Sequence, residues 1–147
     1  MGDNPPDAET KEPISLLIWY DGTNGLTIDS SGLAISSHQL WGRGIKTTPL
    51  TVSRLMLKPA EVDALKNSLK VLDVCAIRPK RSNPMPGERT RQLSLSFPGL
   101  QCVVALMANE WNSEPKPRAC SRVIETVLER VNREGVSEVI APLDAGH

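Results

Sequence analysis

An alternation of large apolar and small polar residues marks 92–97 as a β-strand with one solvent-facing side. The six positions read Gln92, Leu93, Ser94, Leu95, Ser96 and Phe97. This period of two is typical of a half-buried strand. Pro98 and Gly99 follow and suit a tight turn, because proline presets φ and glycine accepts a positive φ. Residues 101–107 are apolar at nearly every position, which predicts a deeper strand that completes a hairpin.

The N-terminal half carries the same strand pattern in further segments. Residues 14–20 form a predicted buried strand, and 26–28 and 33–35 flank a four-residue loop as a second hairpin. A glycine-containing loop at 36–49 then leads into another predicted strand at 50–57.

Two amphipathic helices are also predicted. Pro59 and Glu61 favour a helix start, because proline suits the first turn and a carboxylate complements the positive helix end. This first helix is expected to end near Lys70. The second helix is predicted at 120–134, and Gly135 suits its end.

Together these segments predict an α+β fold, with a mostly antiparallel sheet of five to six strands and two helices packed on one face. The order is β-β-β-β-α-(β)-β-β-α, where the bracketed element is a short strand at 71–77 that the pattern leaves open. Residues 109–117 contain two prolines and are predicted as a connection. We expect one domain at 14–134, between a disordered acidic, proline-rich tail at 1–13 and a C-terminal tail at 135–147.

Composition argues against most enzyme classes. The 147 residues carry 17 basic and 17 acidic side chains, so no net field steers the protein to nucleic acid or to an anionic membrane. Only two histidines occur, and no zinc-protease, P-loop or nucleophile-elbow motif is present. We therefore predict a protein that is not an enzyme, with no catalytic residue, no metal site and no cofactor.

The three cysteines, Cys75, Cys102 and Cys120, include no CxxC pair and leave two alternatives open. One is a single disulfide beside a free thiol, and the other is three buried thiols. Cys120 faces the sheet if it shares a helical face with Ile124, and Cys102 does so if it shares a strand face with Val104. This common direction makes Cys102 and Cys120 the predicted pair.

Two loops carry the candidate binding residues. Residues 78–91 contain five basic residues and one acid, which indicates either a solvated loop or a site for anionic ligands. The scarcity of aromatic residues for base stacking favours the first interpretation. Residues 38–46 combine tryptophan and arginine, the residue types of binding hot spots. The predicted partner-binding residues are Trp41, Arg43, Arg81, Arg89 and Arg91.

The tryptophans outnumber tyrosine and phenylalanine together. Trp19 is expected in the core or on a sheet face. Trp41 and Trp111 fall in predicted loops, where each is either a binding hot spot or a side chain that folds back to seal the core.

The order of these elements resembles small bacterial proteins related to emfourin. The resemblance rests on GTNGLTI at 22–28, a turn at Gly32 and LKPAEVDAL at 57–65, and it spans about residues 14–133. That family inhibits thermolysin-type metalloproteases, so the resemblance implies a non-enzymatic, protein-binding role such as protease inhibition. It carries no functional residue onto this chain.

The N-terminal residues give an indication of the cellular location of the protein. A short polar tail ahead of an abrupt first strand is similar to the mature start of a bacterial lipoprotein, with Met1 in place of the lipidated cysteine. This interpretation predicts an accessory protein of the cell envelope, periplasmic or anchored to the outer membrane by an N-terminal lipid. Its partner would be another protein and not nucleic acid, with no oligomeric state indicated. The alternative is a cytoplasmic tail, on a binder of anionic ligands or nucleic acid that works through 78–91.

Overall fold

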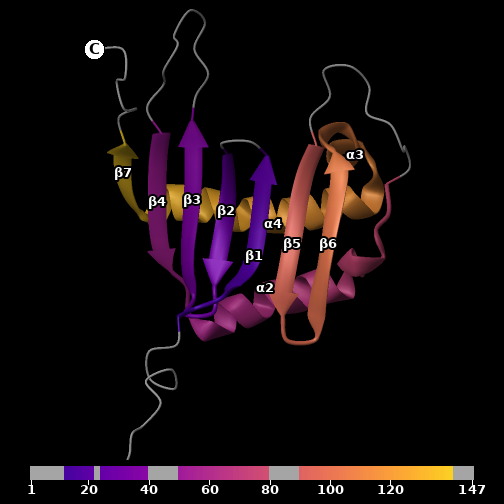
Figure 1. Ribbon diagram of the computed structural model, residues 1–147, viewed down its shortest axis with the longest axis horizontal. Helices are drawn as coiled ribbons and strands as arrows, with labels where there is room; N and C mark the ends of the chain where they lie inside the picture. Colours follow the sequence, from indigo (N-terminus) through magenta and orange to yellow (C-terminus); the bar gives the residue numbers. More distant parts are fainter. Residues whose placement is uncertain (1–11, 22–23, 40–49, 80–89, 141–147) are drawn as a thin grey trace, which may run out of the picture.

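A sheet of seven strands and a layer of helices make up the computed structural model, which describes residues 12–21, 24–39, 50–79 and 90–140 (Figure 1). The strands are β1 (Ser15–Asp21), β2 (Asn24–Asp29), β3 (Leu33–Gln39), β4 (Leu50–Met56), β5 (Thr90–Phe97), β6 (Leu100–Met107) and β7 (Val136–Ile140). The helices are α2 (Pro59–Val71), α3 (Ala108–Ser113) and α4 (Pro115–Glu134), with a 3-10 turn, η1 (Val74–Ala76).

The described strands form one antiparallel sheet in the order β6-β5-β1-β2-β3-β4-β7. β1 to β4 follow one another across the sheet, and α2 then returns the chain so that β5 pairs with β1. β5 and β6 form the predicted hairpin, and Gly99 has the expected positive φ, at 79°. The predicted α+β fold with an antiparallel sheet is therefore confirmed, with seven described strands in place of five to six.

The seventh strand corrects the prediction of a C-terminal tail at 135–147. β7 pairs with β4, with Val136 opposite Arg54. All five residues of β7 are exposed, so no buried face gives the strand a clear apolar pattern. Gly135 allows the chain to pass from α4 to this strand. A Cβ there would lie 2.5 Å from the carbonyl oxygen of Val131 and 2.7 Å from that of Arg54, closer than real contacts allow.

Two further segments differ from the prediction. Residues 71–77 are the end of α2 and the turn η1 rather than a strand, and Asp73 enters this turn with a φ of 57°. Residues 109–117, predicted as a connection, form most of α3 and the start of α4. Pro115 begins α4, where a proline is tolerated because the first backbone N–H groups have no partner within the helix. The prolines here mark a helix start.

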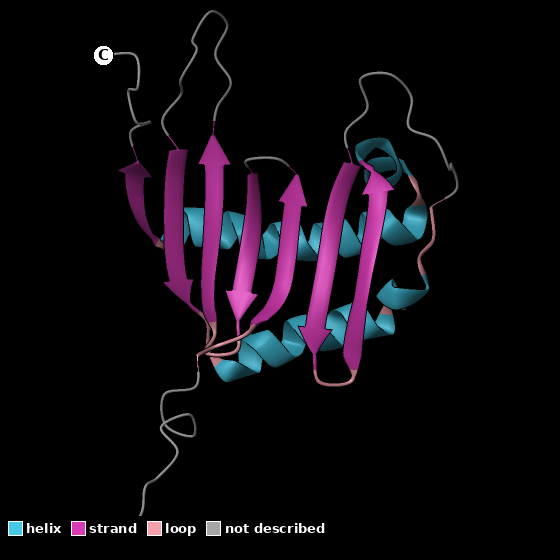
Figure 2. Cartoon of the chain, in the orientation of Figure 1, coloured by secondary structure: helices cyan, strands magenta, loops and turns pink. Residues whose placement is uncertain are grey.

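α2 and α4 cover one face of the sheet, and both lie behind it in the view of Figure 2. The core between the layers is mainly apolar, and it includes an aromatic pair. Trp111 of α3 is fully buried and meets Trp19 of β1 edge to face, with ring centroids 4.9 Å apart. The Trp111 ring N–H also donates to the carbonyl oxygen of Arg91, at 2.8 Å. Trp111 therefore seals the core, the second of its two predicted roles.

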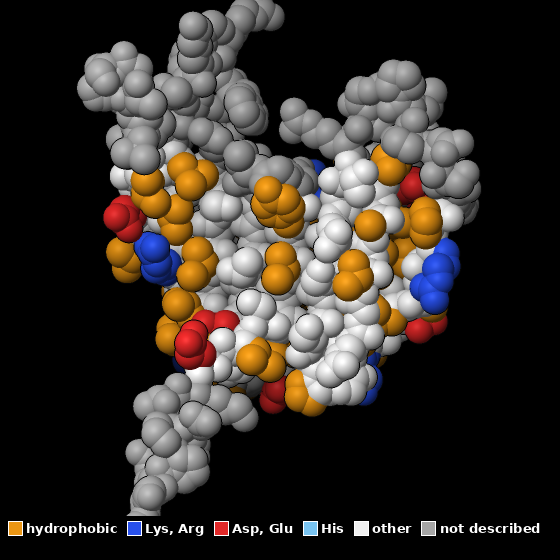
Figure 3. All heavy atoms as spheres, in the orientation of Figure 1, with side chains coloured by type: hydrophobic (Ala, Val, Ile, Leu, Met, Phe, Trp, Pro, Cys, Tyr) orange, Lys and Arg blue, Asp and Glu red, His pale blue; other side chains and the backbone are white. Residues whose placement is uncertain are grey.

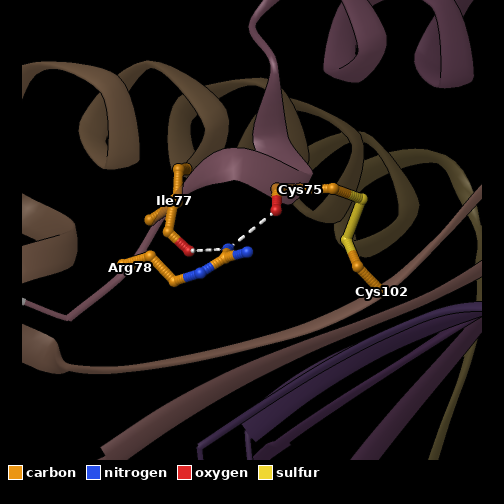
Figure 4. Close-up of a disulfide and its surroundings, with 4 residues drawn as sticks. All are labelled: Cys75, Ile77, Arg78 and Cys102. Carbon is orange, nitrogen blue, oxygen red and sulfur yellow. Dashed lines mark hydrogen bonds between the residues drawn. A yellow bond between two sulfur atoms is a disulfide. The ribbon is translucent and has the colours of Figure 1, made fainter.

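A disulfide joins Cys75 of η1 to Cys102 of β6 (Figure 4). The predicted Cys102–Cys120 pair is therefore wrong. Cys102 does lie on the face that the helices cover, but η1 brings Cys75 against the edge strand β6. The Arg78 guanidinium supports this turn by donating to the carbonyl oxygens of Cys75 and Ile77, each at 2.9 Å. Cys120 is a fully buried free thiol, and its burial raises its pKa to about 11.

Candidate protein-binding surface

The predicted loop site is only partly described by the structure. Trp41, Arg43, Arg81 and Arg89 lie outside the described residues, so their role stays a prediction. The strands that flank these two loops are β3, β4 and β5, and their relevant ends lie at the same end of the sheet. β1 and β2 separate β5 from β3, which corresponds to about 14 Å at the usual strand spacing.

Arg91 is the one predicted site residue that the structure describes. Its side chain is only 19% exposed and forms an ion pair with Glu125 of α4, with N and O 3.5 Å apart. The guanidinium carbon lies 5.3 Å from the centre of the Trp19 ring, in cation–π range. Arg91 therefore connects β5 to α4 over the buried tryptophan pair, and this packing accounts for the residue without a ligand.

A pocket of about 190 Å³ opens beside Arg91, between the sheet and α4. Its lining residues are Trp19, Gly25, Ser37, His38, Arg91, Glu125, Leu128 and Asn132. This volume falls below the roughly 300 Å³ at which small-molecule sites begin. The two opposite charges that line it already pair with each other. The pocket is therefore a weaker candidate than the open surface on the other side of the sheet.

That other face carries no helix among the described residues, and Figure 3 views it directly. Ser36 points to the covered face, where its hydroxyl donates to Asn132 of α4. Because side chains alternate along a strand, the neighbours of Ser36 point to the uncovered face. Cross-strand pairing aligns them in two rows through all seven described strands. We call these the Thr27 row and the Gly25 row.

The Thr27 row reads, from β6 to β7, Val103, Ser94, Ile18, Thr27, Ile35, Arg54 and Val136. The Gly25 row reads, in the same order, Ala105, Gln92, Tyr20, Gly25, Ser37, Val52 and Glu138. Each row thus contains a single charged residue, and the two charges form an ion pair, Arg54 with Glu138 at 3.2 Å. In Figure 3 the middle of the face is accordingly orange and white, with blue and red toward its edges.

Large apolar side chains are exposed on this surface at β1, β6 and β7, whereas Val52 of β4 is only 7% exposed. Val103 is 64% exposed, Tyr20 54% and Ile18 37%. The solvated face of an antiparallel sheet is usually polar, whereas depletion of charge with aromatic enrichment marks the centre of protein interfaces. The uncovered face, defined by the Thr27 and Gly25 rows, is therefore the candidate binding surface.

The sequence does contain one sign of this face, which is that several outward strand positions are polar but uncharged. The outward positions of β5 include Gln92, Ser94 and Ser96, which mark a wet side but carry no charge. The same holds for Thr27 in β2. Only the register between strands shows that these uncharged positions join into continuous rows.

The comparisons with known proteins add no relative: no family model, no curated protein and no solved structure matches the chain. Within the described residues, no helix is long and apolar enough to cross a membrane. In that same part of the chain, no group of three or more histidine, cysteine, aspartate or glutamate residues is arranged to hold a metal ion.

Proposed function

We propose that the chain is a non-enzymatic protein-binding module that binds its partner through the uncovered face of the sheet. The observation that carries this proposal is the nearly uncharged pair of rows across seven strands, with Ile18, Tyr20 and Val103 exposed. A rigid sheet held from behind by α2 and α4 presents these side chains with little loss of conformational entropy on binding.

The disulfide supports a role in the cell envelope. Disulfides such as Cys75–Cys102 persist in oxidising compartments and are rare in the cytosol. This is consistent with an exported accessory protein, periplasmic or lipid-anchored at the outer membrane. Protease inhibition, which the emfourin resemblance implies, belongs to the same class of function, because an inhibitor acts by covering another protein.

The contacts of two arginines weigh against the alternative of a cytoplasmic binder of anionic ligands. Of the five basic residues in 78–91, the structure describes the guanidinium contacts of Arg78 and Arg91. Arg78 donates to backbone carbonyl oxygens of its own turn, and Arg91 pairs with Glu125. Both charges therefore serve the fold rather than a free anion-binding patch.

A photo-cross-linking amino acid at position 103 tests the proposal. Val103 lies on the uncovered face, and the matched control is Val71, which is 84% exposed at the end of α2. In extracts of cells that make the protein, we expect the probe at 103 to cross-link a polypeptide that the probe at 71 does not. Equal labelling from both positions, or none from position 103, would contradict the proposed surface.

Protease inhibition can be tested separately. Thermolysin incubated with an excess of the intact chain should lose activity on a peptide substrate. Thermolysin incubated with the Ile18→Lys variant should keep its activity. Full protease activity at every concentration of the wild-type chain would remove inhibition of thermolysin-type enzymes from the proposal.

A further inference from the structure

We infer that, in the isolated protein, a second copy of this chain occupies the uncovered face, so that two sheets stack across a two-fold axis parallel to the strands. The inference rests on the proposed function, because it takes the uncovered face to be a protein-binding surface and names its occupant.

The Thr27 row is nearly the same in both directions. From β6 to β7 its residues are Val, Ser, Ile, Thr, Ile, Arg and Val, with Thr27 of the middle strand at the centre. A two-fold axis along β2 places each residue opposite the one at the same distance on the other side of Thr27. Val103 then faces Val136 of the second copy, and Ile18 faces Ile35. An interface between identical surfaces requires this self-complementarity.

The charged residues also fit this arrangement. Arg54 would face Ser94 of the second copy, and Glu138 would face Ala105, so neither charge meets a like charge. Arg54 and Glu138 keep their ion pair within each copy. The chain has 17 basic and 17 acidic residues, so no net charge opposes the approach of two copies.

The size of the face matches what a stable dimer needs. Seven strands at a spacing of about 4.8 Å, each about 20 Å long, give roughly 700 Å² of sheet per copy. Standard-size interfaces bury roughly 800 Å² per partner. Two antiparallel sheets pack face to face about 10 Å apart, with side chains of both inner faces interdigitating. The exposed Ile18, Tyr20 and Val103 would fill that space.

Sedimentation of the purified full chain provides the first test. We expect a particle of twice the 16.0 kDa chain mass. Ile18→Lys, next to the centre of the Thr27 row, should give a monomer, whereas Val71→Lys on α2 should keep the dimer. Circular dichroism and a thermal melt establish that each variant is folded. A monomeric wild type, or a dimer that a folded Ile18→Lys leaves intact, would overturn the inference.

A cross-link at the axis tests the geometry and needs no disruptive charge. Thr27 would face its own equivalent, so Thr27→Cys should be joined into a covalent dimer by a bis-maleimide that spans about 10 Å. Val71→Cys and the wild type, whose Cys120 is buried, should remain uncross-linked. Absence of the Thr27→Cys dimer would overturn the proposed axis even if Ile18→Lys does not fold.

The two proposals can fail separately. A monomeric chain whose probe at position 103 cross-links a different polypeptide would overturn self-association and leave the proposed function standing. A dimer linked through Thr27→Cys that captures no other polypeptide would support self-association and remove the other protein from the proposed function.

Discussion

The same strands form both faces of the sheet, but the residue types change across the sheet in different ways on the two faces. The row through Trp19 on the covered face reads Val104, Leu93, Trp19, Leu26, Ser36, Ser53 and Ser137. It is apolar from β6 to β2 and consists of serine from β3 to β7. The neighbouring Thr27 row on the uncovered face is instead nearly symmetric about its centre, with Ser94 and Arg54 as the one unequal pair. The covered row thus changes from large apolar residues to serine across the sheet, and the uncovered row shows no such change.

The contacts of the serines explain why small polar residues occupy this half of the covered row. Ser36 and Ser53 are almost fully buried. Ser36 donates to Asn132 of α4, and Ser53 shares a hydrogen bond of 2.8 Å with Ser137. Small hydroxyl side chains are needed here because α4 ends close to β4, where even a Cβ on Gly135 would collide. Each buried hydroxyl has a partner, so the close approach leaves no unsatisfied polar group among these serines.

The largest expected effect separates the two faces directly. Trp111→Ala removes a fully buried ring, its edge contact with Trp19 and its hydrogen bond to Arg91. We expect a loss of about 3–5 kcal/mol in the free energy of unfolding, measured with urea. Tyr20→Ala, on the uncovered face and 54% exposed in the single chain, should cost no more than about 1 kcal/mol at a protein concentration low enough to separate two copies. Similar losses in both variants would mean that the uncovered face is part of the stabilising core.

The disulfide adds a covalent link on the covered side. Replacing both Cys75 and Cys102 by alanine should cost about 3 kcal/mol, because the bridge closes a loop with a sequence separation of 27. Reductant should destabilise the wild type by a similar amount and leave this double variant unchanged. Cys120→Ala should remain sensitive to reductant. If instead Cys120→Ala abolishes that sensitivity, the disulfide would involve Cys120, and the Cys75–Cys102 pairing would be wrong.

Parts of this fold could be predicted from the sequence, and other parts could not. The β5–β6 hairpin was predictable because its alternation and its Gly99 turn are local signals. β7 was not, because all five of its residues are exposed and its pairing with β4 joins distant segments. The direction of Cys102 was predicted correctly, but its partner depends on where the turn η1 comes to lie.

The candidate surface was less predictable than the fold. Local patterns pointed to loop residues such as Trp41, which lie outside the described residues. Arg91, from the same prediction, packs on Trp19 and pairs with Glu125. The Thr27 row combines residues from seven strands, so no local window of sequence contains it. It became visible only when the register of every strand pair was known.

The smallest expected effect concerns the helix layer that makes the faces different. Glu61 of α2 accepts from the backbone N–H of Lys58 at 2.9 Å and pairs with Arg130 of α4. The backbone hydrogen bond, followed by the Arg130 contact, holds the pKa of Glu61 below its ordinary value of 4.5. A carboxylate with a lowered folded pKa stabilises the fold above its unfolded pKa, and this stability is lost as the pH falls through the folded pKa.

Glu61→Gln should therefore lower Tm by only a few degrees at neutral pH, because an ion pair that is still about one-third exposed contributes little. Below the folded pKa of Glu61 the wild type and the variant should converge, since the wild-type carboxyl is then neutral as well. Thermal melts from pH 7 down to pH 3 measure this convergence. Asp63→Asn, an exposed carboxylate of the same helix, is the matched control and should follow the wild-type curve. A difference between Glu61→Gln and the wild type that stays constant over this range would show that the glutamine substitution acts by packing rather than by charge.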